Sequence, residues 1–256
     1  METAKLRNML HLQWAKAKVI KNCFLALCLL TIFSQSSFAQ KEIYREDQDN
    51  KLYYFGLSLS AVRSRFQLEH DPSFLQQDSI LVSEPGNAPG LSLRLVAALN
   101  LSYRFELRFN PGLIFTDRPI LYKLNPNYPP DMDQGYKVKK SVESIITTFP
   151  LDVKFKSDRI GNFRVYMLGG VKADIDLASN AQKRKAEDQV RINKYSYGIE
   201  GGIGFSFYRK SVTVSPELKI SNGLNDLHDR NPALNYSRVL GSIQSRMIIF
   251  TIHLEG

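Results

Sequence analysis

The sequence predicts an all-β fold: an eight-stranded antiparallel up-and-down transmembrane β-barrel with short periplasmic turns and long outer loops. In residues 145–175, apolar and polar side chains alternate with a period of two on both sides of a short polar link. That period is typical of β-strands, whose successive side chains point to opposite faces. Similar segments recur along the chain, and the links between them are alternately short and long. Outer-membrane barrels with both termini in the periplasm have this organisation.

Residues 1–39 have the features of a secretory signal peptide. Five basic residues precede a ten-residue apolar run, and Ser37-Phe38-Ala39 follows it as a small-x-small cleavage site. The run is too short to span a bilayer core of about 30 Å. Cys28 inside the run makes a lipoprotein the alternative. We predict cleavage between Ala39 and Gln40.

Cleavage would change the composition of the chain. It removes five basic residues, one acidic residue, both cysteines and the only tryptophan, and lowers the formal net charge from +9 to +5. The mature chain would have no disulfide or cysteine metal site, and its small, dispersed excess of charge argues against nucleic-acid binding. We expect the intact mass of the membrane-extracted protein to match a chain that begins at Gln40. A mass that includes Trp14 would contradict this prediction.

Residues 40–51 are polar and are predicted to be a flexible periplasmic lead-in to a barrel domain at 52–256. An even strand count would close the barrel with no unpaired edge in lipid. The predicted strands are 53–61, 91–99, 105–115, 145–156, 163–175, 195–207, 212–220 and 246–254. The predicted outer loops are 67–88, 117–137, 176–194 and 222–237, and the predicted turns are 100–104, 157–162 and 208–211. Pro111, Pro150 and Pro216 are expected at bulges or strand ends.

The apolar face of these strands is predicted to contact lipid. The opposite face is rich in glycine and serine, which suits a narrow lumen. Tyrosine and phenylalanine near the strand ends fit an interfacial girdle. A soluble lipocalin-like barrel, with its apolar face inward, has the same period and is the alternative.

Charged residues on the inward face predict an ion-pair network. A barrel of eight strands is just wide enough for its own side chains to fill it, and an unpaired buried charge is costly. A charge-selective pore is the alternative interpretation. The residues assigned to the network are Arg94, Glu106, Arg108, Asp152, Lys154, Arg164, Lys172, Asp174, Glu200, Glu217, Lys219 and Arg246.

Candidate catalytic or metal-binding groups are few. His70-Asp71 and the Asp226-Leu-His228-Asp229 segment have residue types found in metal sites and acid–base pairs, but we interpret them as solvated loop residues. The glycine-rich runs at 169–170 and 201–204 lie inside strands and lack the strand–loop–helix context of a phosphate site. The sequence therefore predicts no enzyme, no cofactor and no small-molecule substrate.

Several motifs are spread across the predicted strands and turns. They are Leu107-Arg-Phe-Asn-Pro-Gly-Leu-Ile-Phe115, Phe149-Pro-Leu-Asp-Val-Lys-Phe-Lys-Ser157, Arg159-Ile-Gly-Asn-Phe-Arg164, Gly169-Gly170, Asp176-Leu-Ala-Ser179, Ser215-Pro-Glu-Leu-Lys219 and Gly223-Leu-Asn225. Together they resemble the PorT family of outer-membrane proteins, which belongs to the type IX secretion and gliding machinery of some Gram-negative bacteria. Thr148 stands where the family often has an acid, and the chain ends in Leu254-Glu-Gly256 without a terminal aromatic residue. The resemblance implies a non-enzymatic component required for cargo export, with outer-membrane lipid and other secretion proteins as partners.

An eight-stranded barrel is too narrow to pass folded cargo, so a role in export would depend on contacts. The turn at 157–162 is the longest predicted short link and lies within the motifs above. We predict that it docks another secretion component through Lys156, Asp158, Arg159 and Asn162, with a solvated turn as the simpler alternative. A generic structural or adhesive barrel is the alternative function.

Overall fold

The computed structural model describes residues 42–49, 51–71, 79–129, 134–179, 192–229, 236 and 239–256. The predicted leader and its cleavage site lie outside these residues. No helix among them is long and apolar enough to cross a membrane. The elements are η1 (Glu46–Asp49), β1 (Tyr53–His70), β2 (Ile80–Pro85), β3 (Ala88–Asn100), β4 (Phe105–Phe109), β5 (Gly112–Leu124), β6 (Lys137–Lys156), β7 (Phe163–Asp176), β8 (Tyr195–Tyr208), β9 (Thr213–Gly223) and β10 (Leu240–Glu255).

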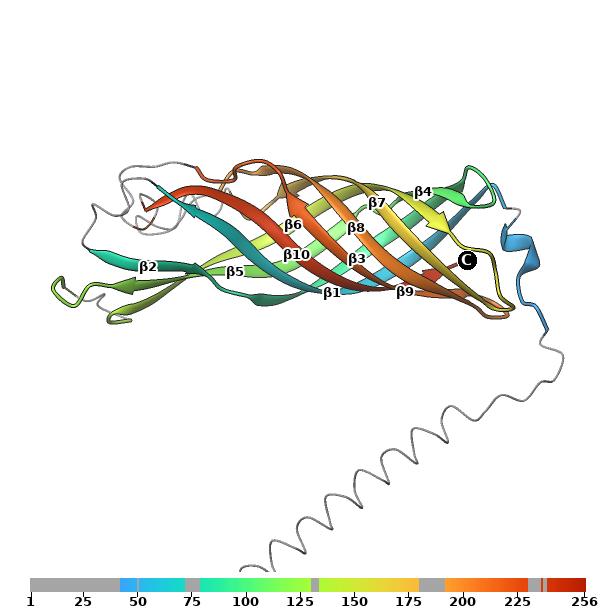
Figure 1. Ribbon diagram of the computed structural model, residues 1–256, viewed down its shortest axis with the longest axis horizontal. Helices are drawn as coiled ribbons and strands as arrows, with labels where there is room; N and C mark the ends of the chain where they lie inside the picture. The colour runs from blue at the N-terminus through green and yellow to red at the C-terminus, as the bar shows by residue number, and fades with distance from the viewer. Residues whose placement is uncertain are drawn as a thin grey trace, which may run out of the picture. The chain divides into compact units, whose positions relative to one another are not determined.

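The strands form a closed antiparallel ring. β1 pairs with β3, β3 pairs with β5, the strands from β5 to β10 pair in chain order, and β10 pairs with β1, which closes the ring. Among the described strands, the short β2 pairs with β5 alone. The ring has eight strand positions because two of them are each occupied by a pair of strands. β2 and β3 both pair with β5, and β4 and β5 both pair with β6. Figure 1 shows the strands winding around one barrel. The predicted fold class is confirmed.

The prolines coincide with interruptions in the hydrogen-bond ladder. Pro111 separates β4 from β5, as expected for a residue without an N–H group. Pro150 lies inside β6, and its carbonyl accepts a hydrogen bond from Asn110, which lies in the break between β4 and β5. The N–H group that Pro150 lacks would therefore point at this break and not at a continuous strand. The β8–β9 pairing omits the positions opposite Ser215 and Pro216.

An apolar band covers the outside of the periplasmic half of the barrel. On β6, outward side chains from Ile145 to Phe155 are exposed and, apart from Thr147, apolar. At about 3.3 Å per residue and a tilt of about 40°, this stretch rises about 25 Å, the height of a lipid-facing band. The soluble alternative, with its apolar face inward, is wrong.

Beyond this band the outward residues become polar and the inward residues become apolar. The alternation of inward and outward side chains continues without a break. On β6 the outward residues become Glu143, Ser141 and Lys139, whereas Val142 and Val138 point inward and are buried. The same change occurs along β1, β5 and β10. The inversion is expected where a barrel leaves lipid and enters water, because its apolar side chains must then be buried inside.

The inversion corrects the predicted loop boundaries. Residues 67–88 include the end of β1 and all of β2, and residues 117–137 include most of β5. The interior of this outer half is a hydrophobic core, which the sequence analysis did not anticipate. Its buried residues come from strands and outer connections and include Phe66, Ile80, Ile120, Tyr122, Val138, Ile192, Leu227, Leu240 and Ile243.

Candidate functional site

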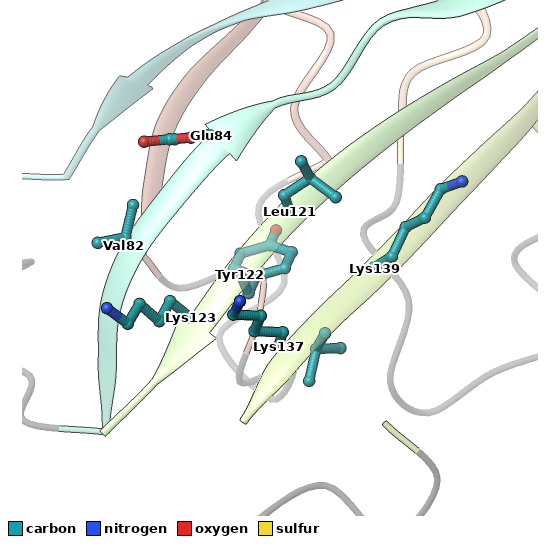
Figure 2. Close-up of a pocket in the computed structure, with 8 residues that line it drawn as sticks. Val82, Glu84, Leu121, Tyr122, Lys123, Lys137 and Lys139 are labelled. Carbon is teal, nitrogen blue, oxygen red and sulfur yellow. The ribbon is translucent and has the colours of Figure 1, made fainter. Parts of the chain in front are cut away.

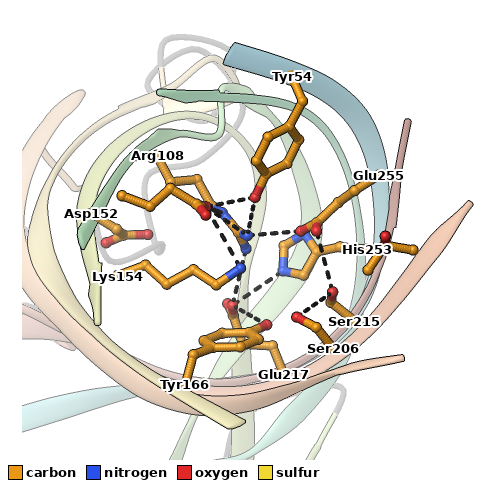
Figure 3. A network of polar contacts seen from close by, with 12 residues as sticks. Tyr54, Arg108, Asp152, Lys154, Tyr166, Ser206, Ser215, Glu217, His253 and Glu255 are labelled. Atoms are coloured by element: carbon orange, nitrogen blue, oxygen red, sulfur yellow. Dashed lines mark hydrogen bonds and ion pairs between the residues drawn. The ribbon is translucent and has the colours of Figure 1, made fainter. Parts of the chain in front are cut away.

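The lumen of the periplasmic half contains a buried polar network centred on Arg108 (Figure 3). The guanidinium of this fully buried side chain lies 2.7 Å from Glu255, 3.1 Å from Glu106 and 3.4 Å from Glu217. Tyr54 donates a 2.7 Å hydrogen bond to Glu106 and accepts one from Arg108. One planar cation thus links carboxylates on three strands, as the geometry of five N–H donors permits.

Lys219 is the second centre of this network. Its Nζ lies 2.7 Å from both Asp152 and Glu200, and 3.6 Å from Glu217. Because Glu217 pairs with both Arg108 and Lys219, it joins the two centres. It also accepts a 3.0 Å hydrogen bond from Tyr166. The Tyr166 ring occupies the space where a side chain at Gly204 would lie, since an added Cβ there would clash with the ring.

The remaining predicted residues have different positions. Lys154 and Lys156 lie 3.6 Å and 3.4 Å from Glu106, and Lys172 forms a separate 2.6 Å pair with Asp174 nearer the outer half. Arg94 is buried and donates to Ser92, and Arg164 is buried with its guanidinium 5.2 Å from the ring centroid of Tyr103. The sequence analysis missed Tyr54, Tyr166, His253 and Glu255, although strict alternation along β1, β7 and β10 places all four inward.

The assignment of Arg246 to the lumen network is wrong. Its position on β10 has the parity of the exposed Ile248 and Phe250, so it faces outward. Arg246 lies just beyond the apolar band, where a charged outward side chain no longer contacts hydrocarbon.

The network fills the space that a pore would need. A cavity bordered by Tyr54, Glu106 and Lys154 near the periplasmic end measures about 10 Å³, as does one bordered by Arg118 and Asp176 nearer the outer half. Each has room for about one water molecule. The arrangement can hold charges in place, but these cavities offer no route for an ion or a substrate.

The periplasmic end is covered by the chain's own lead-in. The Arg159 guanidinium donates to the backbone carbonyls of Tyr44 and Arg45, and lies 3.8 Å from the centroid of the Tyr208 ring. Tyr44 N–H in turn donates a 2.8 Å hydrogen bond to Asn162 Oδ1. In the described part of the chain, Arg159 contacts this segment rather than standing exposed for a partner.

Further contacts hold the lead-in across the barrel mouth. Arg45 donates a 2.7 Å hydrogen bond to the Glu255 carbonyl, and the buried Gln48 borders the cavity beside Glu106. Residues 43–48 therefore contact the barrel, whereas the sequence analysis predicted a flexible lead-in. A hydrogen bond from Lys51 lowers the pKa of Asp47 in the same segment.

The predicted docking turn is only partly a turn. Lys156 belongs to β6, and its buried side chain points into the lumen, so it does not contribute to an exposed surface. Asp158 is exposed and forms a 3.1 Å ion pair with Arg104 of the neighbouring turn. Docking of a partner at this end stays a prediction.

The histidines do not form a catalytic or metal site within the described ranges. His70 is exposed, as predicted, but belongs to the end of β1 rather than to a loop and lies 3.0 Å from Ser83. His228 is buried in an isolated bridge with Ile192, so its interpretation as a solvated loop residue is wrong. His253 lies in the lumen, 3.3 Å from Glu217. No group of three or more His, Cys, Asp or Glu residues in this part of the chain is placed to hold a metal ion.

The outer half carries a basic hollow on its surface (Figure 2). It measures about 370 Å³ and is bordered by Lys123, Lys137 and Lys139, with Glu84 and Val82 on β2. Lys123 and Lys137 are directly paired across β5 and β6. This surface belongs to the part of the barrel that rises beyond the apolar band.

Residues 33–229 match the family described as outer membrane protein beta-barrel domain. The chain belongs to this family. It is an outer-membrane barrel, embedded in lipid through its apolar band, as the localisation prediction required. A comparison with curated proteins found no match.

Solved structures give distant likenesses. OprG from Pseudomonas aeruginosa has 14% identity and a TM-score of 0.42 over 79% of this chain and 92% of its own. Neisserial surface protein A has 12% identity and a TM-score of 0.38 over 78% and 96%, respectively. Ail of Yersinia pestis, solved with the heparin analogue sucrose octasulfate, has 9% identity and a TM-score of 0.35 over 80% and 100%. The family assignment of this barrel rests on the family match and not on these structures.

Proposed function

We propose that this barrel is a non-enzymatic component of a protein-secretion system of the PorT-like, type IX kind, and that it acts through contacts rather than as a pore. The observation that supports action through contacts is the filled lumen around Arg108 and Lys219. The motifs that resemble the PorT family support the secretion role. Its partners would be other secretion proteins, with neither nucleic acid nor a small-molecule substrate involved.

We further propose that the periplasmic end makes the contact. The lead-in contacts the turn at 157–162 there, that turn is joined to the neighbouring one by the Arg104–Asp158 pair, and Arg159 holds the lead-in in place. Arg159 is then a positioning residue: its guanidinium orders a segment of the chain that a partner would recognise. This differs from the sequence-based hypothesis, in which Arg159 itself grips a partner carboxylate.

Cargo export in a deletion strain tests both proposals. We expect export to fail without the gene and to return with the wild-type chain. Arg159→Ala should reduce export while barrel abundance and heat-modifiable gel migration stay normal, because the guanidinium lies outside the buried network. Faster proteolysis of the lead-in in the purified variant would show directly that it had been released.

Arg209→Ala is the matched control, since Arg209 is an exposed arginine in another periplasmic turn. It should leave export and proteolysis unchanged. Normal export in the deletion strain would refute the secretion role. Normal export with Arg159→Ala, at normal abundance and with the lead-in released, would refute the contact surface alone.

A structural or adhesive role is the second candidate. The observation that favours it is the outer half, which extends well beyond the apolar band and carries a basic surface hollow. An intact secretion phenotype in the deletion strain, together with reduced attachment of cells to an acidic surface, would favour this role instead.

A further inference from the structure

Three arginines lie on the outside of the barrel immediately beyond its apolar band. Arg63 and Arg65 follow Ala61 along the outward face of β1, and Arg246 follows Ile248 along the outward face of β10. All three are at least partly exposed. They stand where outward side chains pass from hydrocarbon to headgroups, the depth that long basic side chains reach at membrane interfaces.

Two of these arginines lie directly opposite each other on neighbouring strands. Arg65 and Arg246 are direct partners across β1 and β10, and Arg63 is the partner of Ile248. Like charges directly opposite each other destabilise a sheet. No acidic side chain among the described residues lies within ion-pair distance of any of the three. An anion from outside the chain would relieve the repulsion.

A hollow between the arginines can receive such an anion. It measures about 230 Å³ and is bordered by the three arginines, Asn87 and Ile248. Its wall is therefore basic and polar on the outer side and apolar on the side that continues into the lipid-facing band. A molecule that complements it has a negatively charged head attached to an apolar tail.

We propose that this hollow binds the phosphorylated headgroup of a glycolipid in the outer leaflet of the outer membrane. Arginine matches phosphate oxygens with paired N–H donors, and such charge-assisted hydrogen bonds are the stronger ones. Asn87 adds an amide for a sugar hydroxyl, and Ile248 contacts the start of an acyl chain. The site depends on the barrel's place in the membrane and is independent of the proposed role in secretion.

Two comparisons within the molecule favour a lipid over a free anion. On β5 and β6 the first outward residues beyond the band are instead acidic, Asp117 and Glu143, so the positive charge at this level is not shared by every strand pair. The larger basic hollow at Lys123, Lys137 and Lys139 lies eight residues beyond Phe115 along β5, about 20 Å further from the band. Of these two hollows, the arginine hollow is the one that adjoins the acyl chains.

Native mass spectrometry of the full, detergent-purified barrel tests the proposal, with bis-phosphorylated lipid A as the probe. The wild-type barrel should retain one lipid A molecule. Dephosphorylated lipid A should bind to the same barrel at least about tenfold more weakly. The variant R63Q/R65Q/R246Q should lose at least about tenfold in affinity for the phosphorylated form. The variant K123Q/K137Q/K139Q removes the same number of outward charges and should match the wild type.

Heat-modifiable migration reports whether each variant is folded. If the triple arginine variant does not fold, Arg246→Gln alone should weaken binding about two- to fivefold, and Arg246→Lys should restore part of the loss. Equal affinity for phosphorylated and dephosphorylated lipid A would overturn the proposal, as would unchanged binding by a folded arginine variant. Displacement of the lipid by millimolar inorganic phosphate would show a site for free anions and would also overturn it.

Discussion

Replacing Arg108 by methionine is expected to lower the barrel's free energy of unfolding by about 3–5 kcal/mol. The substitution keeps an unbranched side chain but removes the only cation within ion-pair distance of the Glu255 carboxylate among the described residues. Glu255 would keep only the 3.3 Å hydrogen bond from Ser215. Glu106 and Glu217 would each retain other cations, Lys154 and Lys219 among them, so the cost falls mainly on Glu255.

Urea unfolding of the barrel in lipid vesicles measures this change, and two further variants identify its cause. Arg104→Gln removes the exposed pair with Asp158 and should cost less than about 1 kcal/mol. The double variant Arg108→Met/Glu255→Met removes both buried charges and should recover most of the loss. A double variant no more stable than Arg108→Met would show that the loss came from packing and not from an unpaired carboxylate.

Replacing Leu151 by arginine is expected to cost about 2–4 kcal/mol, the second large effect. Leu151 faces outward on β6 near the middle of the apolar band, between Phe149 and Val153. An arginine there would place its guanidinium in hydrocarbon at the depth where burial of charge is most costly. The same vesicle unfolding assay measures the loss.

Ser141→Arg is the matched control for this prediction. Ser141 faces outward on the same strand, ten residues away and beyond the polarity inversion. Arginine at this position would be in water, and the free energy of unfolding should change by less than about 0.5 kcal/mol. Equal losses at the two positions would contradict the assignment of the band to lipid.

The part of the fold that contacts lipid could be predicted from the sequence. Between Ile145 and Phe155 the outward residues are almost all apolar, and the inward ones include Asp152 and Lys154, so the period of two is unambiguous. Alternation also placed Arg108 and Lys219 in the lumen. It did not identify which acid each would meet, because those contacts join strands far apart in the sequence.

The outer half was missed for a physical reason. From Lys137 to Ser144 the strand still alternates, but its apolar residues now point inward. The predicted strand required outward apolar residues and therefore began only at Ile145. Arg246 was grouped with the inward Thr251 and His253, but it has the even parity of the outward Ile248, and the strand at Arg246 has already left the lipid. The docked lead-in gave no sequence signal, since Tyr44 and Asn162 are 118 residues apart.

The length of β6 beyond the band has an electrostatic consequence for the tip of the β5–β6 hairpin. From Ile145 to Lys137 the strand rises about 20 Å above the hydrocarbon edge. The Debye length at physiological ionic strength is about 8 Å, so more than two screening lengths separate Lys123 and Lys137 from the edge of the membrane. The potential that these lysines produce is therefore almost independent of the lipids around the barrel, and it acts on molecules that approach from outside the cell.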